Sequence, residues 1–326
     1  MIRIIGLLLL IISINACNTD KSSNKKDLQD TDGIRRYEVE LFNIDSTHFE
    51  KGLEAIYPYY KVFLGNQLPD ESGMRQLKDF VHDPQIKGTY EYTMKKFPDL
   101  QSLERGFDAA FKNYKREFPD AIIPVVYTYI SGFDIRMPIK YADSALIIGL
   151  DLYLGSDYQT YLELGYPVYI TNRLSPEYIL ADCFKEICWT KLPEMNSNVL
   201  LDAMIEQGKT IYFAEVMLPD EKAEHLIKYS SEQLKWVVDN EQNLWSFIIE
   251  NQLLYSTDAK AITMFMTDGP FTSGFSDESP SRTGHWLGWQ IVRNYMDNNN
   301  VTLKELLEDT DYQKILQESG YKPSRP

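Results

Sequence analysis

Apolar residues at helical spacing dominate the first third of the chain. They recur over residues 49–63, 86–97 and 100–118, and Pro98 and Pro119 follow the last two segments. This pattern predicts three helices, and because proline cannot continue a helix, the last two should end before Pro98 and Pro119. The aromatic run at the end of the first segment fits either the core or a partner surface, and we favour the core.

β-Branched and aromatic residues replace this pattern between residues 122 and 154. The segments 122–129, 135–141 and 144–154 have the composition and the alternation that are typical of strands. They predict a small sheet of three or four strands, with residues 150–154 as an edge.

Helical spacing returns at Ser175 and continues to the C-terminus. Ser175 followed by Pro176 is typical of a helix start, and residues 231–254 predict one long helix with a buried face. Two capping boxes are predicted, at Ser230–Gln233 and Thr302–Glu305. Residues 267–284 form a loop rich in glycine, proline and serine. The whole pattern predicts an α+β fold that is mainly α-helical with a small β-sheet.

The N-terminal segment has the features of a bacterial lipoprotein signal. Arg3 supplies a positive charge, residues 4–14 are largely apolar, and Ala16 precedes Cys17 as in a lipobox. Cleavage after residue 16 would leave an acylated Cys17 as the new N-terminus. The alternative is an ordinary signal peptide followed by a chance cysteine. Residues 17–33 are polar and lack aromatic side chains, which predicts a flexible linker before a single globular domain at residues 34–326.

Composition narrows the class of protein. Hydrophobic residues at 44% and aromatic residues at 13% are sufficient for a packed core, and a net charge of -15 argues against a nucleic-acid partner. No apolar run after the signal reaches about 18 residues, so we expect no membrane-spanning helix. Cys183 and Cys188 would point about 140° apart on one helix, which predicts two free buried thiols and not a disulfide.

Residues 203–210 match a relaxed phosphate-binding loop pattern, with Gly208 and Lys209 at its end. A phosphate cradle needs a flexible glycine loop, whereas Met204 and its neighbours favour a helix and Glu206 would repel phosphate. We therefore expect no nucleotide ligand.

Metal-ligating and catalytic patterns are weak. The HExxH pair of zinc peptidases is absent, and the histidines are His48, His82, His225 and His285. His285 is either a structural residue or a member of a catalytic triad, and we favour the structural role because no G-x-S-x-G elbow nominates a nucleophile.

Three carboxylates remain as candidate ligands. Asp182 and Glu186 share a helix face at i and i+4, and Glu206 lies on the next predicted helix. Together they could hold a hard cation such as Ca²⁺. The alternative, which we favour, is a solvated face paired with Lys185 and Lys191.

Spaced blocks in the C-terminal half carry a family resemblance. They are Met204-Ile205-x-x-Gly208-Lys209-x-x-Tyr212-Phe213, Trp245-x-x-x-Ile249-Glu250, Gly269-Pro270-Phe271-Thr272, Ser279-Pro280-x-Arg282-x-Gly284 and Gly288-Trp289-Gln290-Ile291-Val292-Arg293. Over residues 195–323, and more loosely back to Arg36, the chain resembles the gliding motility-associated lipoprotein B (GldB) family of Bacteroidota. The resemblance implies a lipid-anchored cell-envelope protein that faces the periplasm and is required for gliding motility and type IX secretion.

The resemblance also implies a peptidase-like layout. The family is similar to predicted zinc peptidases of the gluzincin kind, in which the third metal ligand would fall on Glu206. Their HExxH helix would fall near residues 175–191, where this chain offers Asp182 and Glu186 but no histidine. The implied architecture is that of a zincin-like pseudo-peptidase without metal, cofactor or enzymatic activity.

A cleft bordered by the loop at residues 267–284 is the candidate binding region. Phe271, Phe275, Trp286 and Trp289 could anchor an extended peptide there. We expect the membrane, through the lipid, and other envelope proteins of the gliding and secretion machinery as partners. The alternatives are an unconventional metallopeptidase that uses the three carboxylates and a cell-wall-binding lipoprotein.

Overall fold

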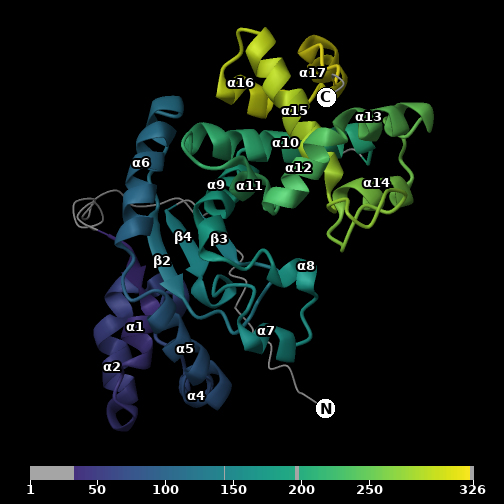
Figure 1. The fold of residues 1–326 in the computed structure, drawn as a ribbon. Coiled ribbons are helices and arrows are strands. Elements are labelled where there is room, and N and C mark those ends of the chain that lie inside the picture. Colours follow the sequence, from purple (N-terminus) through teal and green to yellow (C-terminus); the bar gives the residue numbers. More distant parts are fainter. Residues whose placement is uncertain (1–32, 143, 195–197, 324–326) are drawn as a thin grey trace. The chain divides into compact units, whose positions relative to one another are not determined.

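A computed structural model describes residues 33–142, 144–194 and 198–323 (Figure 1). They belong to the second of the two units into which the chain divides, residues 33–326. The predicted signal segment at residues 1–16, the lipidation site Cys17 and the linker as far as Asp32 lie outside the described residues.

The chain before the main strands is helical. Its helices are α1 (Tyr37–Phe42), α2 (Phe49–Ile56), α3 (Lys61–Leu64), α4 (Glu71–His82), α5 (Pro84–Lys96) and α6 (Gln101–Glu117). The helices predicted at residues 86–97 and 100–118 are confirmed as α5 and α6. The single helix predicted at residues 49–63 is wrong. A 3₁₀ turn separates α2 from α3, because Pro58 has no N–H to continue the α-helical hydrogen bonds.

The aromatic side chains around this turn mostly face the core. Tyr60 is buried, and the Phe63 ring stacks on Tyr37 with centroids 4.2 Å apart. Tyr59 points outward. The aromatic run is therefore core for most of its residues, as predicted.

The small sheet is confirmed and has four strands in the described residues. They are β1 (Arg35–Arg36), β2 (Val125–Tyr129), β3 (Ile139–Ala142) and β4 (Ala145–Gly149), in the order β1-β2-β4-β3. β2 pairs in parallel with both β1 and β4, and β3 pairs with β4 as an antiparallel hairpin. With helices before and after this mixed sheet, the α+β class is confirmed.

The predicted strands were too long. β2 begins at Val125, because Ile122 and Ile123 are exposed and precede a proline that cannot donate to a ladder. Residues 150–154 are not an edge strand: Leu150–Leu152 forms a 3₁₀ turn, and its leucines are fully buried. An apolar run indicates that its residues are buried, but a buried segment can be either a strand or a packed turn.

The rest of the chain is helical. Its helices are α7 (Gln159–Glu163), α8 (Val168–Thr171), α9 (Ile179–Trp189), α10 (Leu200–Met217), α11 (Ala223–Ile227), α12 (Ser231–Asp239), α13 (Glu241–Glu250), α14 (Ala259–Met266), α15 (Thr283–Asn298), α16 (Leu303–Glu308) and α17 (Tyr312–Ser319). None of the helices in the described ranges combines the length and the apolar character that crossing a bilayer requires.

The predicted starts of these helices are mostly correct. Both capping boxes form, at the N-termini of α12 and α16. A 3₁₀ turn begins at Pro176 and leads into α9, but the Ser175 side chain makes no capping hydrogen bond. The single helix predicted at residues 231–254 is wrong, because the chain breaks at Asn240 into α12 and α13. As a result, Val238 and Ile249 point to solvent instead of to the core.

Two glycines allow the central helices to touch. α15 crosses α10 (Figure 1), and a Cβ atom added to Gly288 would lie 1.7 Å from the Met204 carbonyl oxygen of α10. A Cβ atom added to Gly208 would lie 2.3 Å from the Gly288 carbonyl oxygen. Both distances are far inside van der Waals contact, so the two backbones pack directly against each other. Gly208, the glycine of the phosphate-loop pattern, therefore serves helix packing.

We expect Gly288→Ala to lower the free energy of unfolding by about 3 kcal/mol, because α10 and α15 must separate to accommodate the methyl group. Urea unfolding followed by tryptophan fluorescence measures this loss.

Gly88 provides the matched control. It lies exposed within α5, and an added Cβ atom would meet nothing within 4 Å. Gly88→Ala should raise the free energy of unfolding by about 0.5–1 kcal/mol through helix propensity. Equal effects of the two substitutions would contradict the close contact of α10 and α15.

Candidate functional site

Asp182 lies in a buried ion-pair network on α9. Its Oδ2 atom accepts hydrogen bonds from Lys228 Nζ at 2.6 Å and from the Tyr153 hydroxyl at 2.9 Å. Lys185 Nζ lies 3.8 Å from its Oδ1 atom. Burial would raise the pKa of Asp182, but the two ammonium groups and the Tyr153 hydroxyl outweigh burial and hold the pKa below its usual range. The lysine-paired interpretation suits Asp182, but the face is largely buried, and Lys228 takes the place expected for Lys191, whose ammonium lies over the Tyr114 and Phe118 rings.

The other two candidate carboxylates have different surroundings. Glu206, on α10, is buried and accepts a hydrogen bond from the Tyr312 hydroxyl at 2.7 Å. Glu186 is only partly buried, and burial together with the Asp182 charge raises its pKa. Within the described ranges, no three His, Cys, Asp or Glu side chains gather as a metal-binding group.

These residues do not fit the zinc ion that the peptidase-like layout implies. Zinc sites in proteins rely on imidazole or thiolate ligands, and the positions in question carry Asp182, Glu186 and Glu206. Asp182 is neutralised by lysines, and Glu206 is held by Tyr312. No catalytic step through a metal is therefore derived.

The two remaining cysteines are free and buried, as predicted. Both lie on α9, and burial raises the pKa of Cys183 and of Cys188. They stay protonated at neutral pH, and a thiol is a far weaker nucleophile than a thiolate.

His285 lies near the start of α15. Its Nε2 atom is 3.0 Å from the Met266 carbonyl oxygen, which can only accept, so this nitrogen carries the proton. Burial and the neighbouring Arg282 lower the pKa of His285 to about 3. A neutral imidazole bonded to a backbone carbonyl fits the structural role that we favoured.

The aromatic side chains of the predicted cleft do not line one surface. Trp286 is buried and donates its indole N–H to Glu241 at 2.8 Å, and Trp289 is buried and donates to Glu215 at 2.7 Å. The prediction that they anchor a ligand is wrong, because both rings fill the core and each indole N–H already donates to a carboxylate of the chain.

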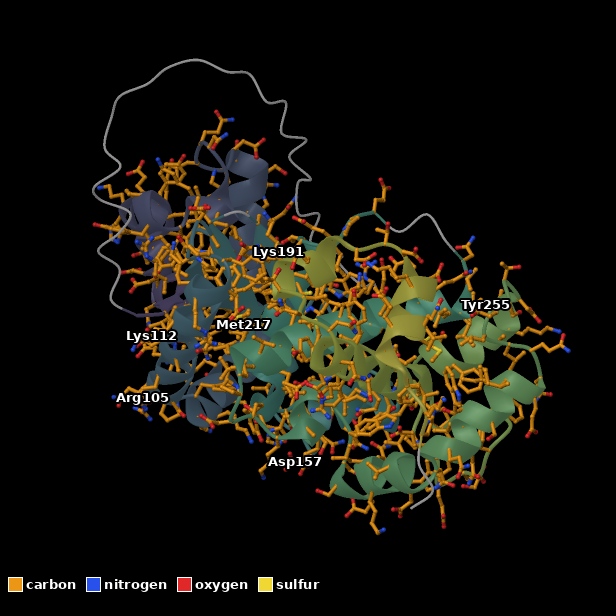
Figure 2. The ribbon with its side chains drawn as sticks, turned by 90° about the horizontal axis from the view of Figure 1, so that it is seen from above. Arg105, Lys112, Asp157, Lys191, Met217 and Tyr255 are labelled. Carbon is orange, nitrogen blue, oxygen red and sulfur yellow. The ribbon has the colours of Figure 1, made fainter. Side chains whose placement is uncertain are left out.

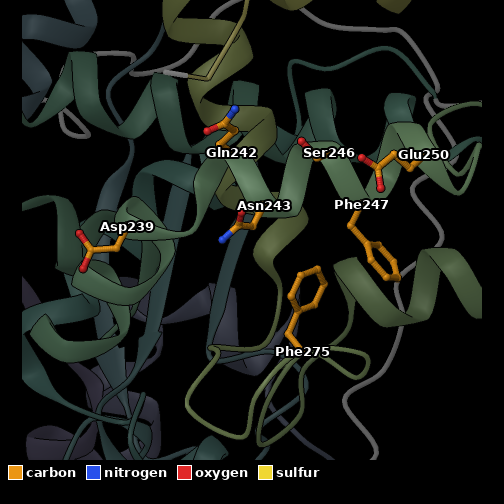
Figure 3. A pocket seen from close by; sticks show the side chains of 7 residues that line it. All are labelled: Asp239, Gln242, Asn243, Ser246, Phe247, Glu250 and Phe275. Atoms are coloured by element: carbon orange, nitrogen blue, oxygen red, sulfur yellow. The ribbon is translucent and has the colours of Figure 1, made fainter. Parts of the chain in front are cut away.

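Phe271 and Phe275 lie in two separate surface grooves. Phe275 packs near Phe247 in a groove of about 740 Å³ along α13 (Figure 3). Phe271 is 37% exposed and borders a groove of about 580 Å³ along α14, together with Asp268. Of the predicted aromatic anchors, Phe271 is exposed and Phe275 is half-buried, whereas Trp286 and Trp289 are buried.

The Phe271 groove adjoins a network of charged side chains. Asp268 forms ion pairs with Arg173 and with Arg282, whose Nε atom lies 2.9 Å from Asp268 Oδ1. Arg282 also donates to the Lys228 carbonyl oxygen at 3.3 Å, and Lys228 in turn binds Asp182. We call these side chains the basic cluster, and its members are Arg173, Asp182, Lys185, Lys228, Asp268 and Arg282.

Most of the chain matches one known protein family. A model of the lipoprotein family described as "Gliding motility protein GldB" matches residues 20–323. The chain belongs to this family. No curated protein and no solved structure matches the chain. The zincin-like architecture of this GldB-family chain therefore stays a prediction.

Most of the basic cluster was not predicted from the sequence. Arg282 belongs to a quoted family block, but nothing in that block predicts a partner for it. Lys228 and Arg282 both have φ of 60°, which is uncommon for residues with a side chain. The cluster joins segments distant in sequence, and periodicity within one helix cannot predict such contacts.

We expect Lys228→Met to lower the free energy of unfolding of this GldB-family protein by about 3 kcal/mol at neutral pH, because Asp182 would lose its closest cation while buried. The pKa of Asp182 is depressed in the folded protein, so its stabilisation is present above the unfolded pKa, near 3.9, and is lost at lower pH. The deficit of the variant should therefore shrink as the pH falls below about 4. Urea unfolding of the variant and of the unchanged chain at several pH values measures this difference in the free energy of unfolding.

Lys235→Met is the matched control, since Lys235 and Asp239 form an exposed ion pair. Lys235→Met should lower the free energy of unfolding by only about 0.3–0.5 kcal/mol. A deficit of Lys228→Met as small as this, or one independent of pH, would argue against the buried pairing of Asp182.

Proposed function

We propose that this chain is a cell-envelope lipoprotein, anchored through Cys17 and facing the periplasm. In this proposal it acts as a non-catalytic component of the gliding motility and type IX secretion machinery. The family match over residues 20–323 carries the proposal. The lipobox-like sequence that ends at Cys17 and the polar segment after it support the anchor.

The chemistry of the described side chains supports a non-catalytic role. Cys183 and Cys188 are buried thiols, and His285 is neutral and bonded to a backbone carbonyl. Asp182 and Glu206 act as hydrogen-bond acceptors in two different buried networks. We therefore propose a scaffold that binds other envelope proteins of the machinery, with the Phe271 groove as one accessible contact surface.

Complementation of a strain that lacks the gene tests the proposal. We expect the double variant Glu186→Gln, Glu206→Gln to restore gliding and secretion close to the level of the unchanged chain, because neither carboxylate supplies catalysis. Spreading on agar and the amount of secreted protein are the measurements, with immunoblotting of membranes to confirm accumulation.

Cys17→Ser is the control for loss of function, since it removes the acylated residue and should abolish complementation. If the double variant accumulates normally in the membrane but fails like Cys17→Ser, the non-catalytic role is wrong and the metallopeptidase alternative gains support.

A further inference from the structure

The basic cluster holds more positive than negative side chains in a protein of opposite overall charge. The net charge of the chain is -15. The cations of the cluster are Arg173, Lys185, Lys228 and Arg282, and the carboxylates paired with them are Asp182 and Asp268. The side chains of the cations are only 11–17% exposed. Glu186 is the other carboxylate on α9, and burial together with the Asp182 charge raises its pKa. An excess of nearly buried positive charge is costly unless an anion compensates it.

Lys185 is the least satisfied of these cations. Its ammonium group forms no hydrogen bond to any described residue, and its closest carboxylate oxygen, on Asp182, lies 3.8 Å away. That oxygen belongs to a carboxylate whose other oxygen already accepts from Lys228. An ammonium group carries three donors. All three are available to a ligand.

Arg282 offers a second unsatisfied donor. Its Nε atom is buried and lacks a hydrogen-bond partner, because the N–H is not aligned with the Asp268 oxygen 2.9 Å away. The backbone at Arg282 adopts φ of 60°, and the guanidinium lies over the Tyr229 ring. A strained backbone and a stacked ring hold this group in place before any ligand arrives.

The cluster reaches the protein surface at Asp268. Asp268 is 43% exposed and belongs both to the cluster and to the wall of the Phe271 groove. Ser281 lies behind Arg173 and accepts a hydrogen bond from its guanidinium at 3.0 Å. Both guanidinium groups pair with Asp268, so they are the cations of the cluster next to this groove.

We propose that the basic cluster binds the phosphate group of a ligand. A phosphate carries nearly two negative charges at neutral pH, which matches the excess of two cations over the paired carboxylates when Lys185 is protonated. Its tetrahedral oxygens can accept from the planar guanidinium groups and from the Lys185 ammonium at the same time. This site is independent of the motility role proposed above.

The proposal implies a dependence on pH. Burial and the neighbouring cations lower the pKa of Lys185 to about 7 in the ligand-free protein. The groups that face it are Asp182 on its own helix and Lys228, Arg173, Arg282 and His285 on other elements. As the pH rises through 7, Lys185 loses its proton and the site loses a positive charge. Binding of sulfate, which stays a dianion throughout, should therefore weaken.

The test uses the full-length protein in a nonionic detergent at constant ionic strength. Inorganic phosphate and sulfate should raise the melting temperature of the unchanged chain in a saturable manner, whereas chloride should not. In Lys185→Met the apparent affinity for both anions should fall at least about tenfold. The sulfate affinity of the variant should no longer change around pH 7.

The variants are chosen so that folding and binding can be told apart. Lys185→Met removes a largely buried cation that makes no hydrogen bond to the described residues and only a 3.8 Å ion pair with Asp182, which Lys228 also binds, so the ligand-free variant should melt at the same temperature as the unchanged chain or higher. Arg173→Gln is the second test of the site. Lys112→Met is the matched control, because Lys112 is exposed on α6 (Figure 2) and should leave anion binding unchanged. If phosphate and sulfate stabilise no better than chloride, or stabilise both Lys185→Met and Arg173→Gln as well as the unchanged chain, the site is refuted.

Two further arms identify the source of the phosphate. One adds glycerol 3-phosphate, and the other adds phosphatidic acid to the detergent micelles, with phosphatidylcholine for comparison. Stabilisation by glycerol 3-phosphate that Lys185→Met removes would assign the site to a soluble phosphate ester. The same behaviour with phosphatidic acid alone would assign it to a lipid headgroup.

Discussion

The direct backbone contact between α10 and α15 is the constraint on which the rest of the C-terminal half depends. Gly208 and Gly288 leave no side chain between the two helices, so the Met204 carbonyl of α10 lies against α15. This contact fixes how α15 passes α10, and with it the position of Arg282 just before α15. Few sequences satisfy such a contact, because any side chain at either glycine collides with the opposite backbone.

Three carboxylates, of which Glu206 is buried and Glu215 and Glu241 are half-buried, complete the packing around these helices. Glu206 accepts from Tyr312, Glu215 from Trp289, and Glu241 from both Trp286 and Tyr321. Each carboxylate joins a helix to a segment far away in the sequence. Fully satisfied polar networks of this kind specify one arrangement of helices. In this chain the acidic and aromatic residues that suggest a binding cleft therefore largely hold the fold together.

Local signals in the sequence predicted local structure well. The capping boxes at Ser230 and Thr302 are confirmed, because neighbouring residues determine them. The small sheet is also confirmed, but its strand β1 was missed, because Arg35 pairs with Tyr127, which is distant in the sequence. The break at Asn240 was missed, since apolar periodicity continues across it although the chain turns. The 3₁₀ turn at Pro58 was missed despite its proline signal.

The candidate site was harder to predict, because its members meet only in the folded chain. Asp182 was correctly expected to pair with lysine, yet its closest partner, Lys228, lies on another element. The sequence placed Trp286 in an open cleft, whereas the structure buries it against Glu241. Exposure of an aromatic residue depends on tertiary contacts, and composition or spacing cannot determine it.

The central proposal is that Asp182, Glu186 and Glu206 of this GldB-family chain serve ion pairing and packing, and not metal catalysis. Its most direct test is the metal content, by mass spectrometry, of the full-length protein purified from membranes without added chelator and without a histidine tag. The account predicts no zinc near stoichiometric amounts. Near-stoichiometric zinc would contradict it, because Asp182, Glu186 and Glu206 would then have to leave their present partners to hold a metal.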